Sequence, residues 1–353
     1  MLPVIAGVEG QELTPEEREL FAALQPAGYI LFSRNIGDYE LTRELTDELR
    51  RLTKGADEPI IAIDQEGGRV VRTAALQVAL PSAEALAHRR DAHLITQAAY
   101  YTAQCLHTLG INTDFAPVLD LGSSRANALP GRCWGAEPQD VISFAGVWNR
   151  ALQRRGILTC GKHFPGMGGA GADPHHELPV LHGTREDFLR EASIPFTALM
   201  PELPSLMVAH LHLPEMDSEL PSSLSPSLVQ GFLREQLGYE GVVFTDDLCM
   251  GAIARSYRPE EAVPMALEAG CDLPLVCHQA VEHLEAVARA VDKLEPRVLE
   301  TATRRIERFR LMISTLPPMR FLEWNDYLRD VQEFCRRVPE LSASVPASPV
   351  QSY

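Results

Sequence analysis

Eight short apolar runs recur along the first 280 or so residues of the chain. Each run contains apolar residues at successive positions, which is typical of strands that are buried on both faces, as parallel strands are. The runs begin near Pro3, Gly28, Pro59, Ile111, Ile157, Ser205, Gly241 and Cys271, and read PVIAGV, GYILFS, PIIAID, INTDFAPV, ILTCGKHF, SLMVAHL, GVVFTDD and CDLPLVC.

Amphipathic stretches with helix signals separate most of these runs. In SPSLVQGFLREQLG, Ser225 suits the cap of a helix, Pro226 its first turn and Gly238 its end. A doubly wound sheet would alternate in the same way, but eight strand–helix units in about 280 residues match a (β/α)8 barrel in number and size. The sequence therefore predicts an α/β protein built as a single-domain (β/α)8 (TIM) barrel.

The segment after the last run is expected to extend this barrel at its C-terminal end. We expect the barrel to occupy residues 1–314, with LETATRRIERFRLMI in its final helix, and a helical extension with NDYLRDVQEFCRRV to occupy 315–338. The Pro- and Ser-rich segment 339–353 is expected to form a tail without stable structure.

Composition and charge narrow the class of protein. With 45% hydrophobic and 23% charged residues among 353, the chain is an ordinary globular one. Its 32 basic and 48 acidic side chains give a net charge of −16, which argues against a nucleic acid or an anionic membrane as partner.

Features of the termini and the cysteines predict a cytoplasmic protein. The start, MLPVIAGVEG, lacks the basic segment of a signal peptide, and no later window approaches a membrane span. The seven cysteines include no Cys-x-x-Cys pair, and Cys105, Cys160, Cys271 and Cys277 lie in apolar surroundings, as reduced core thiols do.

Polar residues gather where the predicted strands end. In a (β/α)8 barrel the active site is built at the C-terminal ends of the strands. Any one of these residues could serve in a structural ion pair, but their presence after so many strands indicates an active site. They are Asp64, Glu66, Arg69 and Arg72 after the third run, Asp114 and Asp120 after the fourth, Lys162 and His163 in the fifth, His210 after the sixth, and Asp246 and Asp247 in the seventh.

The segment KHFPGMGGAGADPHHELP, residues 162–179, supplies a second titratable group. Asp173 lies two residues from His175, so it can orient the imidazole and favour its charged form. Pro174 disfavours helix at Asp173, and the glycines of this segment allow a loop to move over a ligand. Two-step glycosidic cleavage needs one carboxylate that attacks the sugar and another group that moves protons, which a carboxylate of the seventh run and His175 can supply.

These motifs together resemble the bacterial β-N-acetylhexosaminidases of glycoside hydrolase family 3. The resemblance covers most of the chain to about residue 280 and rests on GYILFSRN, IAIDQEGGRVVR, DFAPVLD, GRCWGAEP, GKHFPGMG with DPHHELP, MVAHLHLP and LGYEGVVFTDDLCM. It implies a single barrel, a retaining mechanism without metal or other cofactor, and release of N-acetylglucosamine from peptidoglycan-derived muropeptides such as those linked to anhydro-N-acetylmuramic acid. We expect the enzyme to act as a monomer on this small carbohydrate.

The resemblance also implies roles for individual residues. Asp246 corresponds to the nucleophile, while Asp247 supports its loop. Asp173 and His175 match the acid/base dyad of the family. The residues that match its sugar-binding positions are Asp64, Arg72, Arg132, Lys162 and His163.

The chain departs from the family pattern around the dyad. The family usually has His where this chain has Met167, Asp where it has Gly169, and Ser where it has Pro174. Cys133 and Trp134 replace the commoner Ser-Phe pair. These changes concern the closed conformation of the loop and the preferred leaving group. His176 and His278 match no family role and are expected on the surface or in packing.

Three other functions fit parts of the sequence. A phosphorylase would use phosphate in place of water, because a histidine acid/base does not repel an incoming anion. A non-catalytic sugar-binding barrel would keep the site without turnover. A metal-dependent hydrolase is suggested by HLH at 210–212 and by His175-His176, but the His-x-His of metal-dependent barrels lies on the first strand rather than the sixth.

Overall fold

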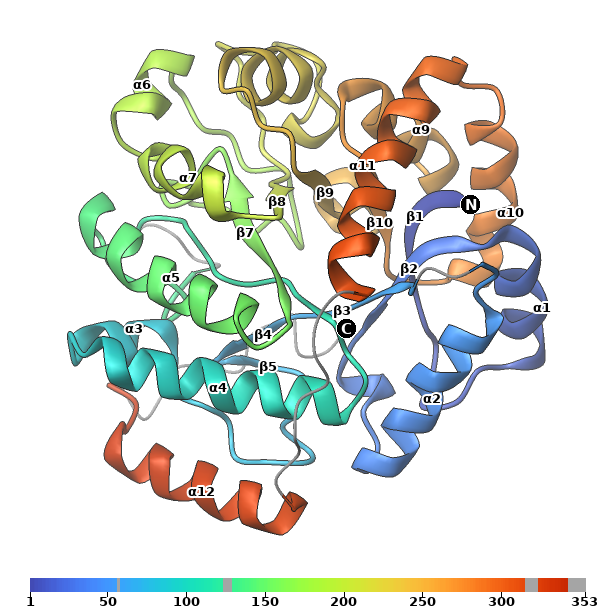
Figure 1. Ribbon diagram of the computed structural model, residues 1–353. Helices are drawn as coiled ribbons and strands as arrows, with labels where there is room; N and C mark the ends of the chain where they lie inside the picture. The colour runs from blue at the N-terminus through green and yellow to red at the C-terminus, as the bar shows by residue number, and fades with distance from the viewer. Residues whose placement is uncertain (56–57, 123–128, 315–322, 342–353) are drawn as a thin grey trace.

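Parallel strands close into a barrel at the centre of the molecule (Figure 1). The computed structural model describes residues 1–55, 58–122, 129–314 and 323–341. Within them each of the eight apolar runs overlaps one barrel strand, so the predicted (β/α)8 fold is confirmed. Around the barrel the strands follow one another in the order β1, β2, β3, β6, β7, β8, β9 and β10. Their bounds are Leu2–Gly7 (β1), Pro26–Leu31 (β2), Ile60–Ile63 (β3), Thr113–Asp114 (β6), Leu158–Phe164 (β7), Ser205–Val208 (β8), Val242–Asp247 (β9) and Leu273–Val276 (β10).

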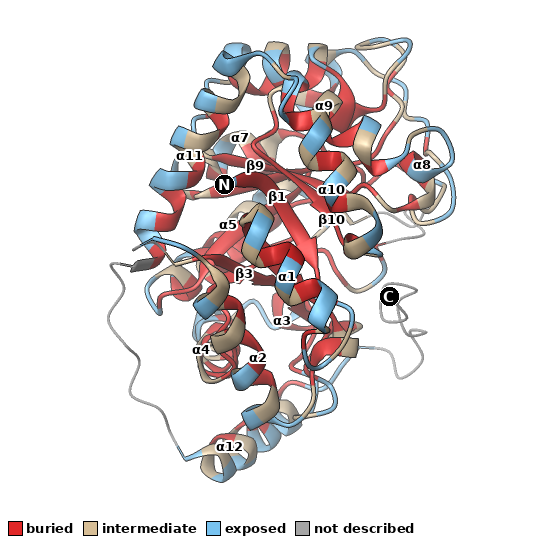
Figure 2. Ribbon diagram, turned by 90° about the vertical axis from the view of Figure 1, so that its right-hand side faces the viewer, coloured by how far each residue is buried: buried red, intermediate tan, exposed pale blue. Residues whose placement is uncertain are grey.

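Helices surround the strands, and Figure 2 shows the strands buried inside while the outer faces of the helices are exposed. In chain order they are α1 (Pro15–Leu24), α2 (Tyr39–Leu52), α3 (Ala83–His88), α4 (Ala92–Thr108), α5 (Pro138–Gln153), α6 (Arg185–Arg190), α7 (Ile194–Leu199), α8 (Gly251–Ala254), α9 (Pro259–Ala269), α10 (Ala280–Val291), α11 (Pro296–Ser314) and α12 (Trp324–Arg337). Short 3-10 turns lie at Ser33–Asn35 (η1), Met200–Glu202 (η2) and Ser222–Leu224 (η3).

The helix predicted after Ser225 forms with a wider turn than expected. It spans Ser227–Gln236 (η4) as a π-helix. The Ser225 hydroxyl oxygen accepts from the amide of Leu228 at 3.2 Å, as a capping residue does. Gly238 follows the end with a φ of +70°, where a glycine is favoured.

A small hairpin leaves the barrel after β3. Its strands, Gln65–Gly67 (β4) and Val70–Val71 (β5), are antiparallel. Gly67, which ends β4, and Gly68, which follows it, have φ of +90° and +57°, which glycine adopts without strain. Because Ile63 of β3 pairs with Asp114 of β6, this hairpin begins level with the end of the fourth strand.

The last described helix lies outside the barrel wall (Figure 1). α12 packs on α4 through aromatic rings, with the Tyr101 and Phe334 centroids 5.5 Å apart. Of the extension expected over 315–338, residues 315–322 are outside the described part of the chain. The same holds for 342–353 of the expected tail.

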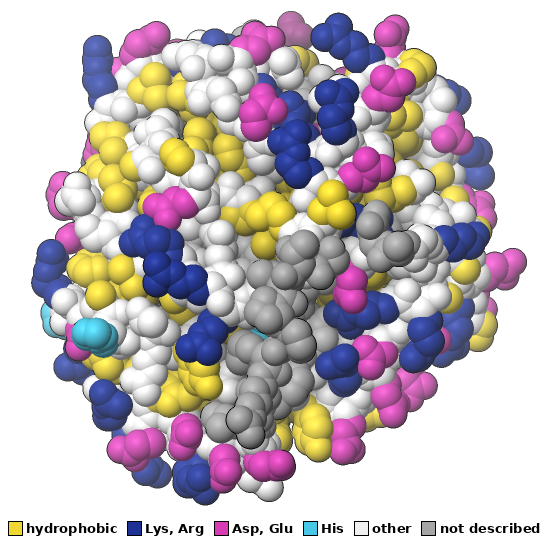
Figure 3. Space-filling view, viewed as in Figure 1, with side chains coloured by type: hydrophobic (Ala, Val, Ile, Leu, Met, Phe, Trp, Pro, Cys, Tyr) yellow, Lys and Arg dark blue, Asp and Glu magenta, His cyan; other side chains and the backbone are white. Residues whose placement is uncertain are grey.

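The cysteines all lie within the described residues and all are free. Five are buried, namely Cys105, Cys133, Cys160, Cys271 and Cys277, which agrees with the reduced core thiols expected from the sequence. Basic and acidic side chains are interspersed over the face drawn in Figure 3. Across the described segments, none of the helices combines the length and the apolar content needed to cross a membrane.

Candidate active site

The C-terminal ends of β3 and β7 place Asp64 against two cations. Lys162 Nζ lies 2.6 Å from one oxygen of Asp64, and an Arg72 guanidinium nitrogen lies 3.1 Å from the other. The Arg72 side chain is fully buried, and its guanidinium lies over the Phe32 ring, 5.2 Å from the centroid. Burial raises the pKa of Asp64, but Lys162 and Arg72 outweigh this and hold it below its ordinary value. The result is an ionised, rigidly held carboxylate.

Glu66 joins the same cluster from β4. Arg132 donates to both of its oxygens, at 2.8 and 2.9 Å, and Lys162 Nζ lies 2.7 Å from Glu66. Burial raises the pKa of Glu66, but Arg132 and Lys162 together lower it below its ordinary value. Sequence reasoning noted Glu66 as a polar residue without giving it a role in the site. The structure shows that this carboxylate links two predicted sugar-binding cations.

Asp120 fixes His163 at the end of β7. Its Oδ2 accepts from the ring Nδ1–H of His163 at 2.7 Å and from the main-chain amide at 3.1 Å. Its Oδ1 accepts from the amide of Met167 at 2.7 Å. One buried carboxylate therefore sets both the orientation of the imidazole and the start of the glycine-rich loop. Its position after the fourth run was visible in the sequence, but these partners were not.

The predicted dyad forms within the glycine-rich loop. Asp173 Oδ1 accepts from His175 Nδ1 at 2.6 Å and from the His175 amide at 3.0 Å. The loop also pairs with the start of α8, because the Gly251 amide donates to His175 O at 3.2 Å and the Ala252 amide to Pro174 O at 3.1 Å. These contacts hold the dyad over the C-terminal end of β9.

Asp246, near the end of β9, lines the same cavities as His175 of the dyad. Asp64, His175, Met207 and Asp246 line both of two small cavities at this end of the barrel. Burial raises the pKa of Asp246, but His163, His210 and His175 outweigh it and hold the pKa below its ordinary value. β9 thus presents an ionised carboxylate to the cavities that His175 also lines.

Comparison with known proteins identifies the family of the chain. The family model described as the glycosyl hydrolase family 3 N terminal domain matches residues 4–309. The chain belongs to glycosyl hydrolase family 3. A Beta-hexosaminidase of Bordetella avium is 37% identical over 307 residues, which cover 83% of this chain and 87% of that protein.

Solved structures of family 3 enzymes agree in fold. A β-N-acetylglucosaminidase from Paenibacillus sp. superposes with a TM-score of 0.86 at 31% identity, covering 95% of this chain and 67% of that one. NagZ from Neisseria gonorrhoeae, in complex with N-trifluoroacetyl-D-glucosamine, gives a TM-score of 0.79 at 28% identity, covering 94% and 97% of the two chains. This family 3 member is a glycoside hydrolase.

In this family 3 hydrolase, Asp247 faces a different environment from Asp246. Its Oδ1 accepts from the amides of Cys249 at 2.9 Å and Cys277 at 3.2 Å. Burial raises the pKa of Asp247 to about 6 despite these amides. Its oxygen is thus committed to the main chain of the neighbouring strand ends.

The histidines of the family 3 hydrolase that matched no role take different places. His176 is exposed. His278 is only partly exposed and lines the cavity beside Asp246, Asp247 and Phe32. The ring of His278 packs on that of Phe32, with the centroids 5.8 Å apart, so the expected packing position also borders the cavity. Burial lowers its pKa to about 4, so its imidazole is neutral at neutral pH.

The HLH segment of the family 3 hydrolase does not present a metal-binding pair. His210 is fully buried; its Nε2–H donates to the Asp247 carbonyl at 2.9 Å, and its Nδ1 accepts from the Ser223 hydroxyl at 2.7 Å. Both ring nitrogens are occupied, which leaves none for a metal. Among the residues that the structure describes, no group of three or more His, Cys, Asp or Glu side chains is arranged to hold an ion.

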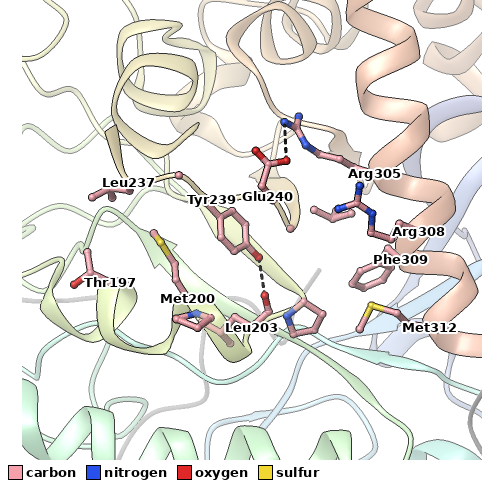
Figure 4. Close-up of a pocket in the computed structure, with 15 residues that line it drawn as sticks. Thr197, Met200, Leu203, Leu237, Tyr239, Glu240, Arg305, Arg308, Phe309 and Met312 are labelled. Atoms are coloured by element: carbon pink, nitrogen blue, oxygen red, sulfur yellow. Dashed lines mark hydrogen bonds and ion pairs between the residues drawn. The ribbon is translucent and has the colours of Figure 1, made fainter. Parts of the chain in front are cut away.

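A separate pocket lies at the opposite end of the barrel (Figure 4). Met200, Tyr239, Phe309 and Met312 are among the residues that line it, near the start of β9. The Tyr239 hydroxyl donates to Leu203 O at 3.0 Å, and Arg305 lies 3.8 Å from Glu240. The pocket shares no residue with the cavities at the C-terminal ends of the strands.

Proposed function

We propose that this enzyme is a retaining β-N-acetylhexosaminidase that releases terminal β-linked N-acetylglucosamine. The observation that carries the proposal is the shared cavity of Asp246 and His175 at the C-terminal ends of the strands. The names of its relatives, a Beta-hexosaminidase and a β-N-acetylglucosaminidase, support the choice of sugar.

In the first step Asp246 attacks the anomeric carbon and forms a covalent glycosyl-aspartate as the bond to the leaving oxygen breaks. His175 gives that oxygen a proton from Nε2, since its Nδ1–H already donates to Asp173. Burial raises the pKa of Asp173, but hydrogen bonds from His175 bring it below its ordinary value, so the carboxylate stays ionised and stabilises the imidazolium.

In the second step the neutral His175 takes a proton from water, and the water oxygen displaces Asp246 from the anomeric carbon. The products are the free sugar with retained configuration and the regenerated carboxylate. Asp247 takes no part in this exchange, because its Oδ1 is held by two main-chain amides and its Oδ2 lies toward His278, 3.9 Å from that ring's Nε2.

The sugar is held by the ionic cluster beside these residues. Asp64 accepts hydrogen bonds from sugar hydroxyls, and Arg72, Lys162 and Arg132 donate them. Arg132, Lys162 and His163 line the same cavity as Asp64. Because each cation is already paired with Asp64 or Glu66, the donors are oriented before the substrate arrives.

We propose that the natural substrates are peptidoglycan-derived muropeptides. We further propose that the enzyme is monomeric and cytoplasmic and needs no metal or other cofactor. The acidic net charge of −16 supports a small carbohydrate rather than a nucleic acid or a membrane surface as partner.

A fluorinated slow substrate tests the chemistry. The label should be found on Asp246 by peptide mapping, be abolished in Asp246→Asn and persist in Asp247→Asn. A label on Asp247, or on no carboxylate, would contradict the assignment. Turnover of an aryl β-N-acetylglucosaminide should exceed that of the matching glucoside. The same assay with added phosphate separates the alternatives, since a sugar phosphate product indicates a phosphorylase and no turnover indicates a sugar-binding barrel.

A further inference from the structure

Helix α12 lies beyond both the barrel wall and the family match, which ends at residue 309. Figures 1 and 2 both draw it beside α4, on the side remote from α9 and α10. Its buried side chains, Tyr327, Val331 and Phe334, form the inner face of an otherwise strongly polar helix. Through this face α12 contacts Gln77 and the ring of Tyr101.

A chain of hydrogen bonds runs from α12 to a predicted sugar-binding residue. The Tyr327 hydroxyl donates to the side-chain oxygen of Gln77. Gln77 Nε2 donates to the hydroxyl oxygen of Thr73 at 3.0 Å, and Gln65 Nε2 donates to the same oxygen at 2.8 Å. The side-chain oxygen of Gln65 accepts from the amide of Arg72 at 3.0 Å.

The chain has a fixed direction, because each amide has its oxygen on one side and its nitrogen on the other. Gln77 turns its oxygen to Tyr327 and its nitrogen to Thr73, and Gln65 turns its nitrogen to Thr73 and its oxygen to Arg72. All of these residues are buried, so a lost partner leaves a polar group unsatisfied away from water. The Tyr327 hydroxyl therefore helps to fix which way both amides point.

Glu340, just beyond α12, binds Ser82, which follows Gln77 by five residues. Both oxygens of Glu340 accept from Ser82, one from its amide and one from its hydroxyl, each at 2.6 Å. Ser82 packs closely on the hairpin turn. A Cβ added at Gly68 would lie 2.5 Å from the Cβ of Ser82. The C-terminal extension thus holds the chain that follows Arg72 at two points, Gln77 and Ser82.

We propose that α12 is a positioning element for sugar binding, in which Tyr327 acts through Gln77, Thr73 and Gln65 to hold Arg72. Tyr327 touches no substrate. It keeps the main chain of Arg72 in register, so that the guanidinium meets both Asp64 and the ring of Phe32. The assignment of Arg72 to sugar binding rests on the function proposed above.

Kinetics on an aryl β-N-acetylglucosaminide test the role of Tyr327. Tyr327→Phe removes only the hydroxyl and should raise KM about three- to tenfold with kcat nearly unchanged, the pattern for lost uniform binding. Gln77→Met should do the same, and the double variant should be no worse than the poorer single one, because both act on one path. Fully additive losses would overturn the proposal.

Val331→Ala is the matched control on α12. It removes buried methyl groups from the same face and leaves every hydrogen bond of the chain in place. It should lower thermal stability but leave KM within about twofold of the unaltered protein. An equal KM increase in Val331→Ala would show that α12 acts through packing alone and would overturn the role of Tyr327.

Amide hydrogen exchange gives a second measurement that does not depend on activity. Peptides covering residues 65–73 should exchange several-fold faster in Tyr327→Phe than in the unaltered protein, and should be unchanged in Val331→Ala. Unchanged exchange in Tyr327→Phe would refute the link. An unaltered protein without turnover would instead count against the proposed function, while the exchange result would still decide on the link.

Discussion

Two adjacent carboxylates, Asp246 and Asp247, show how far neighbouring residues can differ. Three histidines lower the pKa of Asp246 in spite of its burial, whereas burial raises that of Asp247 to about 6. Both line one cavity, but the charge of Asp246 is favoured by His163, His210 and His175, whereas Asp247 is held through its Oδ1 by the amides of Cys249 and Cys277. Stability should therefore respond oppositely to the loss of each charge.

Asp247→Asn should stabilise the protein above pH 6. The pKa of Asp247 rises from 3.8 to about 6 on folding, so its contribution favours folding at low pH and is lost as the pH rises through 6. Above that pH the buried charge costs at most about 3 kcal/mol, which asparagine avoids while keeping an acceptor oxygen. The melting temperature should rise by a few degrees at pH 7.5 and change little near pH 4.

Asp246→Asn is the control of opposite sign. The folded pKa of Asp246 is lowered, so its charge stabilises the fold above the unfolded pKa and this stabilisation is lost in acid. The variant should melt at a lower temperature than the unaltered protein at pH 7.5. A shift of the same sign in both variants would contradict the two environments.

Loss of the Asp173–His175 dyad should slow substrates with poor leaving groups more than substrates with good ones. His175→Ala should slow a natural disaccharide about 10²- to 10⁴-fold and a nitrophenyl glycoside much less, because a phenolate departs without a proton. Asp173→Asn should give a smaller loss of the same kind, and His176→Ala should do little. The measurement is the rate ratio between the two substrates. Equal losses on both in His175→Ala, or a larger effect of His176→Ala, would assign the loop to sugar positioning.

At the residue scale, the sequence predicted the groups that carry obvious chemistry. Asp173 and His175 are two residues apart, so their contact is local and could be foreseen. Glu66 and Arg132 are 66 positions apart, and their pairing depends on how a hairpin meets a distant loop. The place of His278 likewise depends on the level at which β10 ends, which no local pattern states.

Among the elements, the glycine-rich loop and α8 depend on each other. An added Cβ at Gly251 would lie 2.8 Å from His175 O and 2.9 Å from His176 O, closer than real Cβ atoms approach. The site thus needs a residue without a side chain at the start of α8.

Gly251→Ala should displace the dyad and lower kcat by about tenfold or more, because a shift of about 1 Å in a reacting group can cost 10²-fold. Gly171→Ala is the control within the same loop, since an added Cβ there meets no atom within 4 Å. Steady-state kinetics on one substrate compare the two. Similar losses in both variants would show that the loop needs its glycines for flexibility rather than for this contact.

The elements themselves were predictable to different degrees. The eight apolar runs gave the strands, because burial on both faces leaves a plain pattern. The run at Ile111 forms only Thr113–Asp114 as regular strand, although Phe115, Ala116 and Pro117 still make main-chain hydrogen bonds to β3 and β7. The hairpin β4–β5 was not predicted, although the Gly67-Gly68 pair at its turn was a signal for it.

At the scale of the whole molecule, activity should survive chelation. Because both nitrogens of His210 are engaged in hydrogen bonds, the HLH segment offers no ligand pair. Turnover of an aryl β-N-acetylglucosaminide after exhaustive treatment with EDTA should match that of the untreated enzyme. Loss of activity that zinc restores would favour the metal-dependent hydrolase instead.

The sequence predicted the extent of the barrel, but it did not predict where α12 packs. Its amphipathic pattern predicted a helix, and nothing in that pattern names its partner. The contact of Tyr327 with Gln77 joins positions 250 residues apart. Such a contact depends on how the whole chain folds and brings α12 back beside α4, and no local sequence pattern predicts it.

The free cysteines should react slowly with thiol reagents while the protein is folded and quickly once it unfolds. Burial raises the pKa of Cys105 and Cys160 to about 12, and that of the partly exposed Cys335 to about 11. Only the thiolate reacts with alkylating reagents, so the native protein should be modified slowly at neutral pH. Unfolding returns all seven thiols to water at once. Mass spectrometry of alkylated protein would therefore count unfolded molecules directly, without a dye or an engineered label.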